Sequence, residues 1–152
     1  MDEKDRPERV LDNLTARAEI HDCLMRYCRG LDRLDAAMVA SAFHSDGVDH
    51  HSFATLRTAA QIGQALVERQ RTRYRKTMHG ILNEHVEVDG DVARAETYFR
   101  ASLLAERDAR EVLIEGAGRY LDRFERRDGE WRIAERVLVN EWSHSTPLNR
   151  PG

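Results

Sequence analysis

The sequence predicts an α+β fold in which three N-terminal helices pack on a long, highly curved and mostly antiparallel sheet. In the first half of the chain, apolar residues recur at the three- and four-residue intervals of amphipathic helices. From residue 78 the period falls to two, and Asp-Gly pairs at 89–90 and 128–129 mark tight turns between strands. Strands much longer than the usual length of about five or six residues twist and curl. We therefore expect a cone-shaped α+β barrel whose helices close one deep cavity, a common place for a ligand.

The first predicted helix carries an apolar stripe that leads to a carboxylate. Residues 1–11 are charged and expected to be loose, and either Asp12 or Thr15 offers the side-chain oxygen that caps the helix. The stripe consists of Ile20, Leu24, Tyr27, Cys28 and Leu31. Asp32 follows four residues after Cys28, so it lies on or beside the same face near the helix end. Because an unpaired buried charge is costly, this carboxylate needs a partner elsewhere in the chain.

Two further helices and one short strand complete the first half. Asp35 can cap a helix over residues 36–43, and a turn at 44–47 leads into a strand at 48–51. A third helix is expected over residues 58–76. The second half of that helix is rich in Lys and Arg, which suits the negative end of the helix dipole. We interpret this basic end as a solvated face, with attraction of an anionic substrate to the cavity rim as the alternative.

Long strands are expected throughout the second half of the chain, at residues 78–88, 91–107, 111–127 and 130–144. The segment from 145 to 152 is expected to be irregular. One domain therefore spans residues 1–152, with an ordered core at about 12–144 and a loose tail on either side.

The composition indicates a soluble globular protein and excludes several classes of function. Hydrophobic residues make up 41% of the chain and charged residues 34%. A net charge of −3 argues against binding to nucleic acid or to an anionic membrane. No apolar run approaches the roughly 20 residues of a membrane span, and the N-terminus lacks the apolar core of a signal peptide, so we expect a cytoplasmic protein. Cys23 and Cys28 lie on one predicted helix and are expected to pack as small apolar groups rather than to form a disulfide.

Residues from about 14 to 142 resemble the nuclear transport factor 2-like superfamily in its SnoaL-like branch. The resemblance rests on three motifs: Ile-x(6)-Tyr-x(4)-Asp at residues 20–32, Thr-Met-His at 77–79, and Asp-Gly-Glu-Trp-Arg-Ile at 128–133. Within this branch the chain looks most like lyases of the scytalone dehydratase, hexachlorocyclohexane dehydrochlorinase and bile acid 7α-dehydratase types. In those enzymes an Asp at the end of the first helix pairs with a His at the start of the first long strand. The His abstracts a proton, and a leaving group departs.

The resemblance implies a set of catalytic residues in this chain. It places the Asp–His pair at Asp32 and His79. Tyr27 matches a tyrosine of the bile acid enzyme, and Arg136 matches an arginine on the last strand of the dehydrochlorinase. The bile acid enzyme instead has an arginine where this chain has Asn140. The resemblance also implies a cofactor-free reaction on a small molecule.

The chemistry of such a pair supports this role for Asp32 and His79. A carboxylate on one ring nitrogen fixes the tautomer of an imidazole, so that the other nitrogen can take a proton near neutral pH. The alternative is a structural hydrogen bond that ties the helix to the sheet. Tyr27 could donate a hydrogen bond to a developing oxyanion, but it lies about 140° around an ideal helix from Asp32. A core tyrosine is the alternative there.

The last predicted strand has two candidate inner faces. Val137 and Val139 form one of them, which would be purely apolar. Every second residue of a strand lies on the same face, so the other face mixes polar and apolar side chains, as a pocket wall typically does. Its residues are Arg136, Leu138, Asn140, Trp142 and His144. The sequence does not decide which face points inward.

Several polar and aromatic residues are candidates for substrate binding: Asp49, His51, Tyr98, Asn140 and Trp142. A metal site built from residues 49–51 and His79 is conceivable. However, the chain has no helical His-x(3)-His, no Cys pair with zinc spacing and no acidic triad. We therefore expect neither a metal nor another cofactor.

The first functional hypothesis is a cofactor-independent lyase acting on a small, fairly apolar, cyclic or aromatic substrate. Isomerisation and carbon–carbon cleavage by the same base are alternatives. The second hypothesis is a non-catalytic ligand-binding or assembly module, whose cavity would be small or filled by side chains. The outer face of the sheet is too apolar to leave wholly in water, so we expect a homo-oligomer. The resemblance favours a trimer over a dimer.

Overall fold

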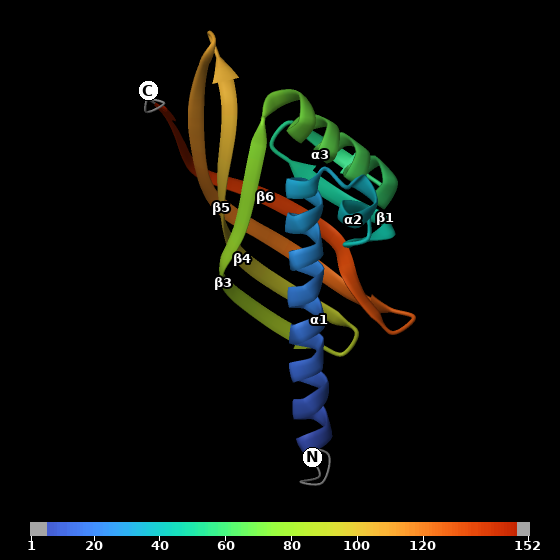
Figure 1. Cartoon of the computed structure of the whole chain (residues 1–152). Helices are drawn as coiled ribbons and strands as arrows, with labels where there is room; N and C mark the ends of the chain where they lie inside the picture. Colours follow the sequence, from blue (N-terminus) through green and yellow to red (C-terminus); the bar gives the residue numbers. More distant parts are fainter. Residues whose placement is uncertain (1–5, 149–152) are drawn as a thin grey trace.

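The structure is a computed structural model, and it describes residues 6–148. Within this range the helices are α1 (Arg6–Arg33), α2 (Ala36–Ala40) and α3 (Ala59–Arg73). The strands are β1 (Phe43–His51), β2 (Ala54–Arg57), β3 (Lys76–Asp89), β4 (Val92–Arg107), β5 (Arg110–Arg127) and β6 (Glu130–Pro147). Figure 1 shows α1 lying across a strongly curved sheet, with α3 beside β1.

The strands of the described residues form one sheet in the order β2-β1-β6-β5-β4-β3. Neighbouring strands are antiparallel except β1 and β6, which run parallel. Gly90 and Gly129 supply the positive φ angles of 60° and 81° that the turns of the β3–β4 and β5–β6 hairpins require. α1 packs against β3 and β6, while α3 packs against β1 and β2. The predicted cone-shaped α+β fold is therefore confirmed.

The core lies between α1 and the concave face of the sheet. Every residue of the predicted stripe on α1, from Ile20 to Leu31, is at most 4% exposed. Phe43, Phe124 and Ile133 face this stripe from the sheet and are fully buried. Burying one such side chain contributes about 1.5–3 kcal/mol. Because the stripe fixes the rotation of α1, it also fixes the direction in which the last turn presents Asp32.

The two cysteines pack as the sequence predicts. Both are free thiols and both are buried. Burial raises the pKa of the Cys23 and Cys28 thiols to about 11. The Cys23 thiol donates a hydrogen bond to the carbonyl of Ala42 at 3.1 Å. Neither sulfur therefore has the thiolate character of a nucleophile.

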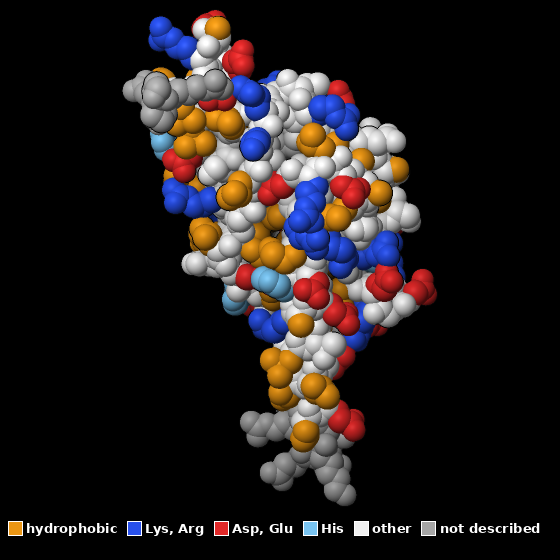
Figure 2. Space-filling model, in the orientation of Figure 1, with side chains coloured by type: hydrophobic (Ala, Val, Ile, Leu, Met, Phe, Trp, Pro, Cys, Tyr) orange, Lys and Arg blue, Asp and Glu red, His pale blue; other side chains and the backbone are white. Residues whose placement is uncertain are grey.

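α1 begins earlier than predicted, at Arg6 rather than near residue 12. Residues 6–11 are thus helical rather than loose. Figure 2 shows hydrophobic side chains on this part of α1, which projects beyond the sheet. The large exposed ones are Val10, Leu11 and Leu14. An ion pair of 2.8 Å between Arg126 and Asp12 ties the projecting helix to β5.

The C-terminal end of the ordered core also differs from the prediction. β6 continues to Pro147 instead of ending near residue 144, because its last residues pair with the start of β5 as far as Val112. The remaining parts of the two predicted tails, 1–5 and 149–152, lie outside the described residues.

The segment between α2 and α3 contains more strand than predicted. α2 ends at Ala40, and β1 already begins at Phe43, which pairs with Ile133 of β6. The predicted turn at 44–47 forms a β-bulge in this parallel pairing. The short edge strand β2 was not predicted, since four residues carry too little periodicity to stand out. No helix within residues 6–148 is long and apolar enough to cross a membrane.

Candidate active site

A cavity of about 410 Å³ lies between the concave face of the sheet and the helices α1 and α3. Small-molecule sites in proteins typically measure about 300–1,000 Å³. The volume does not match the small or filled cavity expected of a non-catalytic module. Its wall is mixed in character, and the large aliphatic and aromatic side chains of its apolar part are Leu31, Leu66, Phe99, Leu103, Ile114 and Leu138. The polar side chains that line it include His51, Gln70, His79 and Asn140.

Asp32 and His79 lie in direct contact. The ring Nδ1 of His79 is 2.7 Å from Asp32 Oδ1, and the backbone N–H of His79 donates to Oδ2 at 2.9 Å. The hydroxyl of Thr77 donates a third hydrogen bond to Oδ1, at 2.8 Å. Since a carboxylate only accepts hydrogen bonds, the proton of the neutral imidazole belongs on Nδ1. Nε2 of His79 then presents its lone pair, and no protein group in residues 6–148 hydrogen-bonds to it.

The end of α1 is built to hold Asp32 at this point. Gly30 is needed there, because a Cβ on it would lie 2.7 Å from both Cγ2 and the backbone nitrogen of Val39 in α2. The carbonyl of Gly30 accepts the N–H of Asp35, and Leu34 ends the helix in the left-handed region at φ 55°. α2 therefore packs tightly on the last turn of α1 and limits its movement.

The environment of Asp32 favours its ionised form. Burial acts to raise the pKa of the Asp32 carboxyl, but the hydrogen bonds and charge of His79 and the hydroxyl of Thr77 outweigh burial. The net result is a pKa below the ordinary value of an aspartate. At neutral pH the carboxylate is thus charged, and it can stabilise an imidazolium on His79.

Tyr27 and Tyr120 line the cavity with fully buried rings. Burial raises the pKa of both phenols well above its ordinary value, so both hydroxyls stay protonated at neutral pH. Tyr27 reaches the cavity although it lies around the helix from Asp32, because the cavity wraps around the end of α1 as far as Leu31. Tyr27 and Tyr120 therefore form part of the cavity wall, and the phenol of Tyr27 also interacts with the buried guanidinium of Arg136.

Arg136 does not reach the cavity, contrary to the expectation that it contacts the substrate. It has no exposed surface, and its guanidinium lies between the rings of Tyr27 and Tyr120, 4.3 Å and 4.0 Å from their centroids. Asp122 on β5 accepts two hydrogen bonds from it, each of 2.7 Å. Burial alone would lower the pKa of Arg136, but the Asp122 carboxylate raises it beyond its ordinary value. Arg136 is thus a buried cation that supports the tyrosines of the cavity wall.

β1 places Asp49 and His51 on the cavity side of the sheet. Asp49 is completely buried, and its Oδ2 lies 3.5 Å from Nδ1 of His51. His51 lines the cavity, with its ring edge-on to Phe53 at 4.9 Å, whereas Asp49 does not line it. His50 points to the opposite face, where its Nε2 lies 3.1 Å from Glu135. Direct contact with a bound molecule is therefore available to His51 and not to Asp49.

The inner face of β6 is the one that carries Arg136, Leu138 and Asn140. Asn140 lies at the exposed mouth of the cavity. Beyond it the register shifts, because Asn140 pairs with Gly118 and Trp142 with Ala117, which leaves Glu141 as the extra residue of a β-bulge. The predicted alternation ends at this bulge.

Trp142 and Tyr98 therefore do not contribute their rings to the cavity as expected. Trp142 borders the cavity, but its indole is 47% exposed and packs under the guanidinium of Arg100. Tyr98 precedes the cavity residue Phe99 on β4, so it points to the outer face, where it is 42% exposed. Both residues belong to the convex side of the sheet.

Arg69 lines the cavity, as the alternative interpretation of the basic helix end allowed, whereas sequence reasoning did not single out Gln70, Tyr74, Tyr120 and Asp122. Strand alternation from Phe124 backwards would have put Asp122 and Tyr120 on the inner face. The α3 residues were hidden because the basic end of that helix was interpreted as solvated. Within residues 6–148, no three His, Cys, Asp or Glu side chains are grouped closely enough to hold a metal ion.

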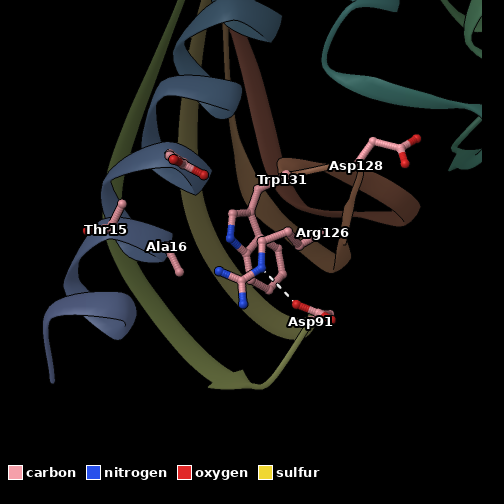
Figure 3. Close-up of a pocket in the computed structure, with 8 residues that line it drawn as sticks. Thr15, Ala16, Asp91, Arg126, Asp128 and Trp131 are labelled. Atoms are coloured by element: carbon pink, nitrogen blue, oxygen red, sulfur yellow. Dashed lines mark hydrogen bonds and ion pairs between the residues drawn. The ribbon is translucent and has the colours of Figure 1, made fainter. Parts of the chain in front are cut away.

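A second, more open pocket lies between α1 and the β5–β6 turn. Figure 3 shows Arg126 reaching across it to Asp91, with Trp131 behind. Thr15 and Ala16 close the side formed by α1. Because the guanidinium of Arg126 is already paired with Asp91 and Asp12, this pocket is a salt-bridged junction between helix and sheet. None of the predicted site residues lies in it.

Comparison with known proteins identifies the family. The model of the SnoaL-like domain matches residues 12–137. No curated protein sequence matches the chain.

Solved structures show the same fold. A single-residue variant of Rv3472 from Mycobacterium tuberculosis, a protein of unknown function, is 27% identical, with a TM-score of 0.75 over 87% of this chain and 75% of that chain. A type 2 hexachlorocyclohexane dehydrochlorinase, LinA, is 24% identical, with a TM-score of 0.78 over 91% of this chain and 93% of that chain. The type 3 LinA of Novosphingobium barchaimii LL02 is 24% identical, with a TM-score of 0.77 over 91% of this chain and 93% of that chain. The chain belongs to the SnoaL-like domain family, within the nuclear transport factor 2-like superfamily.

Proposed function

We propose that the protein is a cofactor-independent lyase in which His79 is the base. The observation that carries the proposal is the 2.7 Å contact between His79 Nδ1 and Asp32, which leaves Nε2 unpaired at a partly apolar cavity of about 410 Å³. A positioned base of this kind contributes typically 10²–10⁴-fold to a proton transfer. The fold shared with dehydrochlorinases supports elimination as the reaction.

In the proposed reaction, Nε2 of His79 takes a proton from a carbon beside an activating group such as a carbonyl. The electron pair of that C–H bond forms a carbon–carbon double bond, and the leaving group departs from the neighbouring carbon with its bonding pair. Asp32 stabilises the imidazolium that results. The hydroxyl of Tyr27 donates a hydrogen bond to the oxygen on which negative charge develops.

The cavity wall indicates the class of substrate. Leu66, Phe99 and Leu138 offer apolar surface suited to a cyclic or aromatic skeleton. Gln70 offers a polar contact, since its buried Oε1 has no hydrogen-bond partner within residues 6–148. A compact ring with one or two oxygen functions matches this combination. Isomerisation and carbon–carbon cleavage use the same base and remain as alternative reactions.

The test is a panel of cyclic ketones with a hydroxyl or a halide on the β carbon, monitored by the absorbance of the enone product. We expect turnover by the wild-type protein and loss of turnover in His79→Ala and Asp32→Asn. His85→Ala is the matched control, because His85 lies on the same strand but is largely exposed and pairs with Glu87. Turnover that survives both site substitutions would rule out the proposed base.

We also infer that the outer face of the sheet forms a homo-oligomer, with a trimer as the expected state. Tyr98, Leu121 and Val137 are each 37–42% exposed on neighbouring strands of this face. Such apolar area is usually covered in a stable protein. Light scattering at micromolar concentration should give three times the chain mass, and Leu121→Lys should reduce it. A monomeric wild-type protein would contradict this inference.

A further inference from the structure

The cavity contains a second histidine paired with a carboxylate. His51 lies at the end of β1, the neighbour of the edge strand β2, and His79 lies at the start of β3, the strand at the other edge of the sheet. The curl of the sheet brings both rings to the same cavity. In each pair Nδ1 faces an aspartate, at 3.5 Å for His51 and 2.7 Å for His79. Within residues 6–148, no protein group hydrogen-bonds to Nε2 of His51, so this nitrogen is available to a bound molecule.

The surroundings of Asp49 lack one positive charge. Asp49 is opposite Arg136 in the β1–β6 register, and Asp122 is opposite Arg136 in the β5–β6 register. Two buried carboxylates therefore flank a single buried guanidinium. Both short hydrogen bonds of that guanidinium are donated to Asp122. The oxygens of Asp49 have no hydrogen-bond partner within the described part of the chain. A proton on His51 would supply the missing charge 3.5 Å from Asp49.

We propose that His51 is the general acid of the reaction, held in place by Asp49, and that the leaving group is a hydroxyl. This inference rests on the proposed function, because it needs His79 to act as the base. His79 Nε2 takes the proton from carbon, and the electron pair of the C–H bond becomes the double bond. The C–O bond breaks toward oxygen, and Nε2 of His51 gives its proton to that oxygen, so that water leaves. Afterwards His79 loses a proton to solvent and His51 regains one.

The assignment of a hydroxyl follows from the need for an acid. A halide leaves as a stable anion and gains little from protonation, whereas hydroxide is a poor leaving group unless it receives a proton as the bond breaks. A site with one base suffices for the first reaction, while a site with both a base and an acid suits the second. Asp49 is a positioning residue in this scheme, since it is buried behind His51 and does not line the cavity.

Other charged and titratable groups share the surroundings of His51. Arg136 and Asp122 lie behind Asp49, as described above. Those that line the cavity together with His51 are Tyr27, Arg69, Tyr74, His79, Tyr120 and Glu141. Glu141 is already paired with Arg119, and the guanidinium of Arg69 lies 4.3 Å over the ring of Phe53. Asp49 is therefore the carboxylate that faces the ring of His51 without an ion-pair partner of its own on another residue within 6–148.

The kinetic test compares β-hydroxycyclohexanone with β-chlorocyclohexanone as probes. We expect His51→Gln to lower kcat/KM for the hydroxy probe by roughly 10²-fold or more and to change it little for the chloro probe. His50→Gln is the matched control, because His50 is the preceding residue and faces away from the cavity. It should change neither rate. An equal loss on both probes in His51→Gln would overturn the acid role and leave the base role intact.

Two further results separate this inference from the proposed function. Survival of both rates in His79→Ala would refute the proposed function itself. A second measurement, NMR of the labelled histidine rings, needs no turnover. We expect Asp49→Asn to change the Nδ1 and Nε2 chemical shifts of the His51 ring, because the carboxylate that faces Nδ1 and orients the ring is gone. Unchanged shifts of the His51 ring in Asp49→Asn would overturn the inference even if neither probe reacts.

Discussion

The two histidine–aspartate pairs of the cavity are built in different ways. Asp32 accepts three hydrogen bonds, two from His79 and one from Thr77, and its side chain is 24% exposed. Asp49 is completely buried, accepts no hydrogen bond within the described residues and lies 3.5 Å from His51. Neutral donors hold the first carboxylate in place whatever the charge on its histidine. The second carboxylate has no such donors in the described part of the chain, and His51 is the side chain that faces it at 3.5 Å.

This difference explains how two similar pairs could perform opposite proton transfers. A base must be a neutral imidazole with a fixed tautomer before it takes the proton. The hydrogen bonds around Asp32 fix the tautomer of His79. An acid must present a proton to the leaving group, and at His51 the buried carboxylate of Asp49 faces the other ring nitrogen at 3.5 Å.

The largest expected effect is on the base. Asp32→Asn should lower kcat on any elimination substrate by about 10²–10⁴-fold, because the amide can no longer stabilise the imidazolium of His79. The measurement is steady-state kinetics together with a thermal melt that shows a folded protein. Asp22→Asn serves as the control, since Asp22 lies on the same helix with an exposed side chain. Near-normal kcat in Asp32→Asn would show that the carboxylate only ties α1 to β3.

The next effect is on stability and concerns the buried cation between Asp49 and Asp122. Arg136→Met should destabilise the fold by about 3–5 kcal/mol, because both carboxylates would lose their buried cation. Chemical denaturation of the purified variant measures this loss. Adding Asp122→Leu to Arg136→Met should recover part of it by removing one of the two charges. If the double variant is no more stable than the single one, the two carboxylates do not share the guanidinium as described.

A smaller effect is expected at Thr77, which belongs only to the first pair. Thr77→Val should reduce the free energy of unfolding by about 1.5 kcal/mol, because a hydrogen bond to a charged carboxylate is lost. Thr77→Ser should retain stability, since it keeps the hydroxyl. Equal stability of the valine and serine variants would mean that the hydroxyl does not support Asp32.

The pH dependence of stability should separate Asp32 from a neutral replacement. The pKa of Asp32 is lowered in the folded protein, so its stabilising contribution is fully present above the ordinary value of about 3.9 for an aspartate. That contribution disappears as the pH falls through the lowered pKa. Denaturation of wild type and Asp32→Asn between pH 5 and pH 2 should therefore give a stability difference that shrinks as the pH falls. A difference that grows in acid would have the wrong sign.

The sequence was informative where local pattern and tertiary contact agree. The stripe on α1 predicts a buried face, and Asp32 follows this stripe at the helix end, so the need for a buried partner follows from the order of the residues alone. The two Asp-Gly turns likewise define the hairpins of the long sheet. These signals depend only on neighbouring residues, which a single sequence contains.

The sequence was uninformative where a strand departs from regular geometry or a partner comes from a distant strand. The bulge at Glu141 turns Trp142 to the outer face, and alternation alone gives no sign of it. Arg136 was predicted to contact the substrate because its partner, Asp122, lies on another strand. The register between these two strands could not be known from the sequence. Tyr98 was assigned to the cavity for its chemistry rather than for its position in the alternation.

The central claim is that Nε2 of His79 removes a proton from carbon, and hydrogen exchange into a ketone without a leaving group tests it most directly. α-Tetralone in D2O can be followed by proton NMR with wild type, His79→Ala and the control His85→Ala. We predict that wild type and His85→Ala accelerate deuterium incorporation at the α carbon, whereas His79→Ala gives the rate of buffer alone. Exchange by His79→Ala at the wild-type rate would contradict the account.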